Sequence, residues 1–182
     1  MLNLEFDPFP TLLTERLILR QISLGDAEIL FSMRSSEKMM AFIQRPLAKT
    51  IEDATKLIES IQEGLGKNES ILWVISLKND PKLIGTIGFW RTQPEHFRAE
   101  IGYLLHADYW QQGIMYEALV KVLEYGFNVM NCHSVEAHID PRNTASQRLL
   151  EKAGFVKEAH FKEDFFWEGQ FLDSAVYSKL SV

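Results

Sequence analysis

Two polar side chains lie one helical turn apart at the start of a predicted helix. A β-branched and apolar stretch, residues 135–139, predicts a buried strand that ends at Asp140. Asn143 is a favourable N-cap residue, and Gly154 is typical of a helix end. Asn143 and Ser146 would therefore project from the first turn of a short helix between two strands. This pair can hold a ligand, although an ordinary capped helix gives the same pattern.

A glycine-containing loop precedes a second predicted helix. Residues 98–105 predict a strand, and a loop with Gly113 leads from this strand into a helix that ends near Asn128. A helix start presents unpaired main-chain N–H groups and about half a positive charge, which together favour phosphate groups. One glycine is weak evidence. The order strand, glycine loop, helix, strand, Asn143 helix, strand is much stronger.

Three passages resemble a known family. They are Thr14–Arg20, Ala99–Leu104 with Tyr109–Ala118, and Asn143–Phe155. At these residues the chain resembles the GNAT family of acetyl-coenzyme A-dependent N-acetyltransferases. Within it, the chain is similar to the RimJ and RimL branch, which acetylates the N-termini of ribosomal proteins. The passages bracket nearly the whole chain, and their order is more specific than any one of them.

The glycine loop departs from the wider family at two positions. That family usually carries Gln or Arg, two residues, Gly, one residue, then Gly or Ala in its pyrophosphate loop. Aligned on Gly113, the first position is Trp110 and the last is Met115. The form Gly-Ile-Met resembles the Rim-like branch, so the resemblance still implies cofactor binding, with an altered approach of the phosphates.

The resemblance implies where acetyl-coenzyme A binds. It implies a splay, a point of divergence between the strands at 98–105 and 133–139, in which main-chain groups of Tyr103–Leu105 bond the pantetheine arm. One N–H there would face the acetyl oxygen. Asn143 would reach the pantetheine and Ser146 the sulfur, while main-chain amides of the glycine loop would hold the pyrophosphate. The implied cofactor residues are Tyr103, Leu104, Leu105, Gln111, Gln112, Gly113, Ile114, Met115, Tyr116, Asn143, Ser146 and Arg148.

An anionic coenzyme requires local positive charge. Arg142, Arg148 and Lys152 surround the Asn143 helix, and they either supply this charge or form a solvated helix face. The five histidines show no metal-ligand spacing, so no metal is implied.

Glu100 is the leading candidate for the base that removes the amine proton. It opens the strand where the amine would arrive, and burial would raise its pKa from about 4.3. An α-amine has a pKa of about 7.7–8.0 and a lysine amine about 10.4, so neutralising the α-amine at pH 7 costs roughly 3.5 kcal/mol less. A modest base therefore suffices for an N-terminal amine. The alternative is a structural carboxylate paired with Arg98 or Arg91.

Ser146 and Tyr103 are the catalytic candidates for the leaving thiolate. A hydroxyl near the sulfur can donate a hydrogen bond to the thiolate. Ser146 is preferred because its motif is the clearer one, with helix packing as its alternative role. Tyr103 is alternatively a strand aromatic.

Composition narrows the class of protein. The chain has 182 residues, 46% of them hydrophobic, which suits one domain with a substantial core. A net charge of −6 argues against a nucleic-acid partner, because phosphates require a basic surface. No signal peptide and no run of about 18 apolar residues is recognised, so we expect a cytoplasmic protein without a membrane partner. Cys132 is the single cysteine, which excludes an internal disulfide.

Hydrophobic periodicity, with the resemblance, predicts an α/β (α+β) fold in one GNAT-like domain. We expect a mixed, mostly antiparallel sheet of about six to seven strands with helices on both faces, and the splay between two central strands. The domain would cover residues 14–182 after an N-terminal extension, residues 1–13. Predicted strands cover residues 15–22, 71–77, 82–91, 98–105, 133–139, 155–164 and 172–180. Predicted helices cover residues 24–33, 37–43, 51–65 and 113–128, and the Asn143 segment.

Three functions compete. The leading one is acetyl transfer from acetyl-coenzyme A to the N-terminal α-amine of a protein, of the ribosomal-protein serine or alanine type. The second is acetylation of a small amine such as an antibiotic, polyamine or amino acid, and the third is a non-catalytic acetyl-coenzyme A-binding module. The protein would be a monomer or a homodimer, because aromatic C-terminal strands either pair between subunits or close the acceptor cleft.

Overall fold

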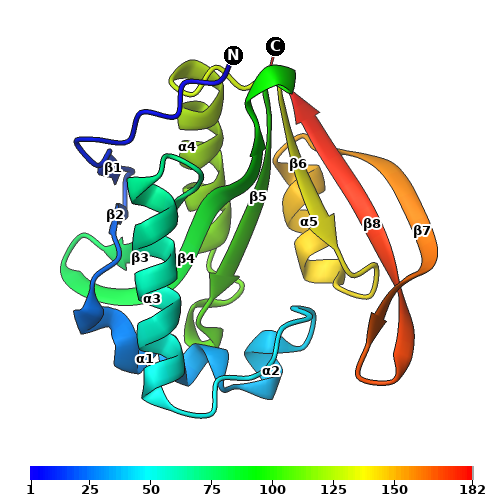
Figure 1. Cartoon of the computed structure of the whole chain (residues 1–182), viewed down its shortest axis with the longest axis horizontal. Helices are drawn as coiled ribbons and strands as arrows, with labels where there is room; N and C mark the ends of the chain where they lie inside the picture. Colours follow the sequence, from blue (N-terminus) through cyan, green and yellow to red (C-terminus); the bar gives the residue numbers. More distant parts are fainter. Residues whose placement is uncertain (182) are drawn as a thin grey trace.

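A single mixed sheet organises the chain (Figure 1). The computed structural model describes residues 1–181. The strands are β1 (Leu12–Leu13), β2 (Leu17–Gln21), β3 (Ile71–Leu77), β4 (Asp80–Gln93), β5 (Arg98–Leu105), β6 (Ser134–Ile139), β7 (Val156–Trp167) and β8 (Gln170–Leu180). They pair in the order β1-β2-β3-β4-β5-β6-β8-β7, antiparallel except for β5 with β6. The expected mixed sheet is confirmed, with eight strands because the two-residue β1 adds to its edge.

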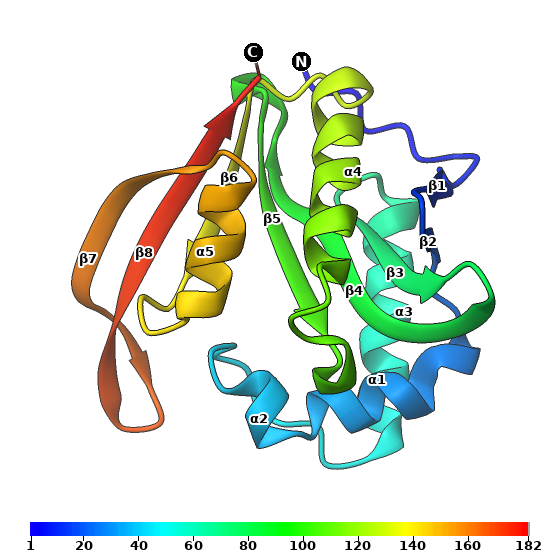
Figure 2. The same ribbon diagram turned by 180° about the vertical axis from the view of Figure 1, so that it is seen from behind.

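Helices cover both faces of the sheet, as expected (Figure 2). The helices are α1 (Ala27–Arg34), α2 (Glu37–Met40), α3 (Ile51–Gly66), α4 (Ile114–Asn128) and α5 (Thr144–Lys152). One face carries α1 to α3 and the other carries α4 and α5. Among the described residues, no helix has the length and apolar character needed to cross a membrane.

Local hydrogen bonding explains where the first helices differ from prediction. The helix expected at residues 24–33 is divided, because a 3₁₀ turn at Leu24–Asp26 precedes α1. The carboxylate of Asp26 accepts from the main-chain N–H of Ser23 at 2.9 Å and thereby tightens this turn. The helix expected at residues 37–43 ends at Met40, where the N–H of Ile43 bonds to the Met40 carbonyl in a turn.

The larger of two apolar cores lies between the sheet and the helices α4 and α5. Trp73 lies at its centre, with its ring centroid 5.3 Å from that of Tyr125 in an edge-to-face contact. Leu2 and Phe6 are buried in the same core, and the Trp73 indole donates to the Pro10 carbonyl at 2.7 Å. Apolar side chains of the first ten residues therefore pack against the sheet. The domain boundary at residue 14 stays a prediction.

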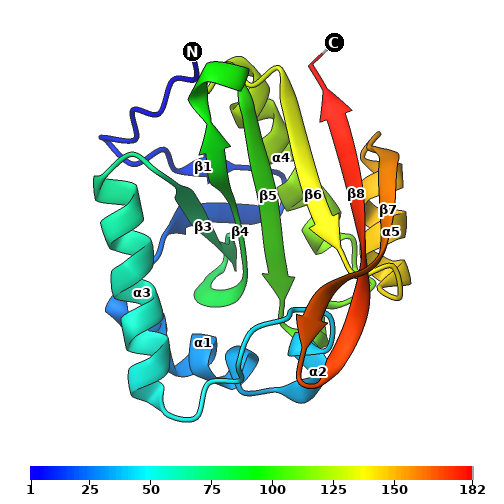
Figure 3. The same ribbon diagram turned by 45° about the vertical axis from the view of Figure 1, so that its right-hand side comes forward.

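The two central strands diverge after a short parallel contact. β5 pairs with β6 only at residues 98–100, whose partners are residues 134–136. Beyond Glu100 the remainder of β5 has no partner on β6, whereas β6 continues its pairing with β8 through Ile139. Figure 3 shows β5 and β6 close at one end and separated at the other. This divergence is the splay that the family resemblance implies.

Candidate active site

The loop before α4 presents a row of unpaired main-chain donors. Gly113 is the N-cap of α4 with φ +74°, a left-handed conformation that glycine adopts readily. The first main-chain bond of the helix runs from the N–H of Glu117 to the Gly113 carbonyl at 3.1 Å. Within residues 1–181, the N–H groups of residues 111–116 donate no hydrogen bond. Six such donors at a helix start fit a pyrophosphate group.

Arg16 lies against this loop, and sequence reasoning missed it. Its Nη1 donates to the Gln112 carbonyl at 3.0 Å, and its Nε pairs with Glu117 Oε2 at 2.6 Å. A Cβ at Gly113 would lie 3.5 Å from Arg16 Nη2. The guanidinium therefore lies beside the predicted pyrophosphate loop, where its charge is balanced by that of Glu117. No local spacing reveals this contact, because the residues that meet are about a hundred positions apart.

The edge of β5 offers main-chain groups to the splay. The N–H of His106 bonds to Ile84 at 2.8 Å, and alternate residues of an antiparallel strand face opposite neighbours. The main chain of Leu104 therefore faces β4, whereas that of Tyr103 and Leu105 faces the splay. The Trp110 indole donates to the Leu105 carbonyl at 2.8 Å, whereas the main-chain groups of Tyr103 and the N–H of Leu105 have no partner among residues 1–181. Of the three residues expected to bond pantetheine, Leu104 directs its main-chain groups toward β4 and not into the splay.

Tyr103 and Ser146, the two candidates for the leaving thiolate, contact each other. The Tyr103 hydroxyl lies 2.5 Å from Ser146 Oγ. Burial raises the pKa of Tyr103 to about 12, with the hydrogen bond to Ser146 acting in the opposite direction, so the phenol stays neutral. Asn143 Oδ1 accepts from the Ser146 N–H at 3.0 Å and caps α5. Its Nδ2 donates to no group in the described chain, so it can still reach a ligand.

Glu100 lies on the opposite face of the sheet from Tyr103, because side chains alternate along a strand. It is 4% exposed, and its carboxylate lies 3.2 Å from Arg91 Nη1. Burial raises the pKa of Glu100 and nearby Glu136 reinforces this, whereas His138 and Arg91 oppose it. Glu100 thus has both a raised pKa and an ion pair with Arg91, and its role as the base stays a prediction.

Glu136 and His138 extend this charged face along β6. Ligand atoms of Glu100, Glu136 and His138 lie within 4.8 Å of one another, a proximity that the histidine spacing did not reveal. Arg98 forms a two-nitrogen ion pair with Glu136, while Arg91 pairs with Glu100. These ion pairs account for the arrangement of the carboxylates. That the site works without a metal stays a prediction.

The three cations expected to meet the coenzyme differ in their contacts. Arg142 is held by the buried carboxylate of Asp140, with Nη2 2.6 Å from Oδ2. Lys152 Nζ lies 4.3 Å from the ring centroid of Tyr116, at the first turn of α4. Arg148 is exposed and forms no ion pair within residues 1–181. Arg148 and Lys152 are therefore the two that remain available.

A tryptophan with two arginines lies beside Glu100, and sequence reasoning missed this group. Trp90 is the register partner of Glu100 on β4. The guanidiniums of Arg91 and Arg45 lie 4.6 and 5.7 Å from its ring centroid. Gln44, one residue before Arg45, donates to Asp140 Oδ2 at 3.4 Å. The loop after α2 thus reaches the open end of the splay.

Comparison with known proteins identifies the family. The family model described as "Acetyltransferase (GNAT) domain" matches residues 16–156. The chain belongs to the GNAT acetyltransferase family. It is an acetyl-coenzyme A-dependent N-acetyltransferase, so the family predicted from the three motifs is confirmed.

The names of individual relatives refer to different acceptors or to none. Uncharacterized N-acetyltransferase YoaA of Bacillus subtilis (strain 168) is 36% identical over 170 residues, which cover 93% of this chain and 96% of that protein. Spermidine N(1)-acetyltransferase of Vibrio cholerae is 24% identical over 162 residues, or 88% and 91% of the two chains. The structure of ribosomal-protein-S5-alanine acetyltransferase from Vibrio fischeri has a TM-score of 0.82 and 26% identity, and covers 94% of this chain and 96% of that one.

Proposed function

We propose that this GNAT enzyme acetylates the α-amine at the N-terminus of a protein. The observation that carries the proposal is the buried Glu100 at the splay, whose pKa is raised by burial and whose neighbour is Arg91. At pH 7 roughly a tenth of an α-amine is already neutral, against fewer than about one in a thousand lysine amines. A carboxylate of this kind is a sufficient base for an α-amine and a poor base for a lysine amine.

The charges around Glu100 disfavour a polyamine acceptor. Arg45 and Arg91 contact the Trp90 ring on the face where the amine arrives. Arg91 is paired with Glu100, so the further positive charge that a polyamine would meet here is that of Arg45, and repulsion between them costs energy at short range. A peptide brings only its α-amine, followed by a neutral main chain. The similarity to the Vibrio fischeri structure supports the same class of acceptor.

The proposed chemistry uses both faces of the sheet. The amine nitrogen attacks the thioester carbonyl in the splay, and its proton passes to Glu100, directly or through one water. When the carbon–sulfur bond breaks, the thiolate receives a proton or a hydrogen bond from the Tyr103–Ser146 pair. Main-chain N–H groups of Tyr103 and Leu105 are the candidate donors to the acetyl oxygen.

Coenzyme A release, followed with a thiol reagent, tests the acceptor. One panel holds short peptides that begin with Ser, Ala or Thr. The other holds polyamines, amino acids and aminoglycosides. We expect turnover of the peptides, abolished when their α-amine is blocked. As a matched control, a blocked peptide with one internal lysine should remain unmodified. Turnover confined to the small amines would contradict the proposal and assign the enzyme to small-molecule acetylation.

A further inference from the structure

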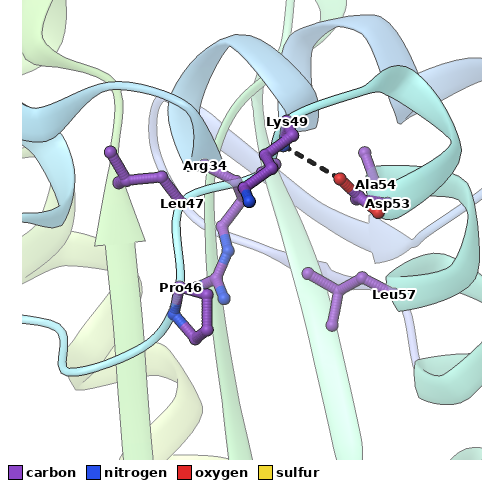
Figure 4. Close-up of a pocket in the computed structure, with 8 residues that line it drawn as sticks. Arg34, Pro46, Leu47, Lys49, Asp53, Ala54 and Leu57 are labelled. Carbon is purple, nitrogen blue, oxygen red and sulfur yellow. Dashed lines mark hydrogen bonds between the residues drawn. The ribbon is translucent and has the colours of Figure 1, made fainter.

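A pocket separate from the candidate active site lies between α1, α3 and the loop that joins α2 to α3. Its volume is about 350 Å³, at the lower end of the range for small-molecule sites. Apolar side chains form much of its wall, contributed by Pro46, Leu47, Ala54 and Leu57. Figure 4 shows Arg34 extending from α1 between Pro46 and Leu57. None of the residues assigned to acetyl transfer lines this pocket.

The charges in the pocket favour an anion. Arg34 forms no side-chain hydrogen bond or ion pair within residues 1–181 and is partly buried. Its desolvation and the nearby Arg45 lower its pKa, which reflects a guanidinium without a compensating acid. Lys49 adds a second positive charge to the lining. Asp53 also lines the pocket, and its carboxylate accepts from the N–H groups of Lys49 and Thr50 at 2.9 and 3.0 Å, so the lining carries one net positive charge.

A part-buried charge without a partner is costly, and proteins usually pair it. In a chain with a net charge of −6 an acidic partner for Arg34 would be easy to supply, yet the described residues supply none. We propose that this pocket binds the carboxylate or phosphate group of a small, partly apolar molecule. Arg34 bonds the anion, Lys49 contributes charge, and the apolar wall contacts the remainder of the molecule.

The pocket is connected to the acceptor side of the active site. Its wall at Pro46 directly follows Arg45, whose guanidinium lies over the Trp90 ring. Gln44 joins the same loop to Asp140. The anionic group in this pocket therefore has two possible sources. It belongs either to the acceptor itself or to a separate small molecule that changes the position of this loop.

Binding is tested without catalysis, by amide-shift titration of the whole protein with hexanoate and with phenyl phosphate. We expect both probes to shift amides of residues 34 and 47–57. Hexanol, which lacks the charge, should not. Arg34→Met should weaken both probes about tenfold or more, as expected for a charge-assisted hydrogen bond. Lys82→Met, which removes an exposed cation on β4, should leave both affinities unchanged. Equal affinity of wild type and Arg34→Met, or equal binding of hexanol, would overturn the proposal.

Two additions keep the test decisive. Arg34→Met should fold at least as stably as wild type, because it removes an uncompensated charge. Arg34→Lys, which keeps the charge, should retain part of the affinity.

If hexanoate inhibits acetylation competitively with the acceptor, the anion belongs to the acceptor. If it changes turnover without competition, the anion is a separate molecule. Failure of peptide acetylation would not affect the binding result.

Discussion

At the residue scale, the neighbours of Glu100 should set the pH at which the enzyme loses activity. kcat should fall as the pH falls through the raised pKa of Glu100, because the base must be unprotonated. Arg91→Met removes a cation that lowers this pKa, so the acid limb should move to higher pH. Glu136→Gln removes a negative neighbour, so the limb should move to lower pH. Profiles of kcat against pH measure both shifts.

Glu100→Gln provides the reference for these profiles. It should lower kcat by about 10²-fold or more and remove the acid limb. The titration of the acceptor amine itself appears in kcat/KM for every variant, so kcat at saturation is the informative quantity. An acid limb at the same pH in wild type, Arg91→Met and Glu136→Gln would mean that Glu100 is not the titrating base.

Tyr103 and Ser146 should act as a unit, because their oxygens lie 2.5 Å apart. Tyr103→Phe and Ser146→Ala should each lower kcat, by about 10²-fold if the pair donates to the thiolate. The double variant should be little worse than either single one, since each change removes the same relay. If the fold-loss in kcat of the double variant equals the product of the two single losses, the residues act independently. Unchanged kcat in Ser146→Ala would leave this residue with helix packing alone.

The residues of the site that are predictable from sequence are those whose evidence is local. Asn143 and Ser146 were placed by the rules for helix starts, and Gly113 by the order of strand, loop and helix. Arg16, Trp90 and Arg45 depend on contacts across the fold, which no spacing along the chain encodes. The contact between Tyr103 and Ser146 also follows only from the packing of α5 against β5. The sequence indicates both residues as alternative candidates for the same role, but it does not indicate that they contact each other.

At the element scale, the start of α4 should be sensitive to a side chain at Gly113. Gly113→Ala places a Cβ on a left-handed residue, which costs about 1 kcal/mol, and brings it within 3.5 Å of Arg16 Nη2. Because the neighbouring N–H groups would move, we expect the KM for acetyl-coenzyme A to rise severalfold with little change in kcat. Steady-state kinetics with acetyl-coenzyme A as the varied substrate measures this.

Gly169→Ala is the matched control for Gly113→Ala. Gly169 also has a positive φ, +81°, but a Cβ there would meet nothing within 4 Å. Both variants should lose a similar amount of stability, and only Gly113→Ala should change the KM. If both variants raise the KM equally, the effect reports general destabilisation and the loop has no special role.

Elements with strong periodicity were the most predictable. The strands at residues 71–77 and 98–105 have the expected bounds, because apolar runs and turn residues mark both ends. β1 was missed, since two residues carry no periodicity and form a strand only through β2. β4 extends to Gln93 past the expected Arg91, through a register shift between Trp90 and Gln93. Such an irregularity depends on the partner strand and is not encoded locally.

At the scale of the whole molecule, the sheet separates two layers of helices, and each layer must be attached to the sheet. The family resemblance predicted the splay and the helices on both faces. The sequence pattern alone could not give the strand order, because pairing is decided by long-range packing. Four exposed phenylalanines lie on the β7–β8 hairpin, Phe161, Phe165, Phe166 and Phe171. Whether they pair between subunits or contact the acceptor stays a prediction.

One buried ion pair fastens the α1–α3 layer to the sheet. Asp26, beside α1, accepts two hydrogen bonds from Arg20 on β2, at 2.9 and 2.6 Å, and Arg20 also donates to the Pro81 carbonyl of β4. Burial alone would raise the pKa of Asp26, but the bonds from Arg20 and Ser23 outweigh it and lower the pKa. The charged form of Asp26 therefore stabilises the fold.

Asp26→Asn should lower the free energy of unfolding at neutral pH by about 2–3 kcal/mol. This is below the range for a fully buried pair, because a quarter of the Arg20 side chain is exposed. The contribution is complete above the unfolded pKa of about 3.9 and is lost as the pH falls through the lower folded pKa. Denaturant unfolding of wild type and variant should therefore converge on acidification. Glu63→Gln, which breaks an exposed pair with Lys67, should cause no measurable change. Equal stability of Asp26→Asn and Glu63→Gln at neutral pH would mean that the two layers are held by apolar packing alone.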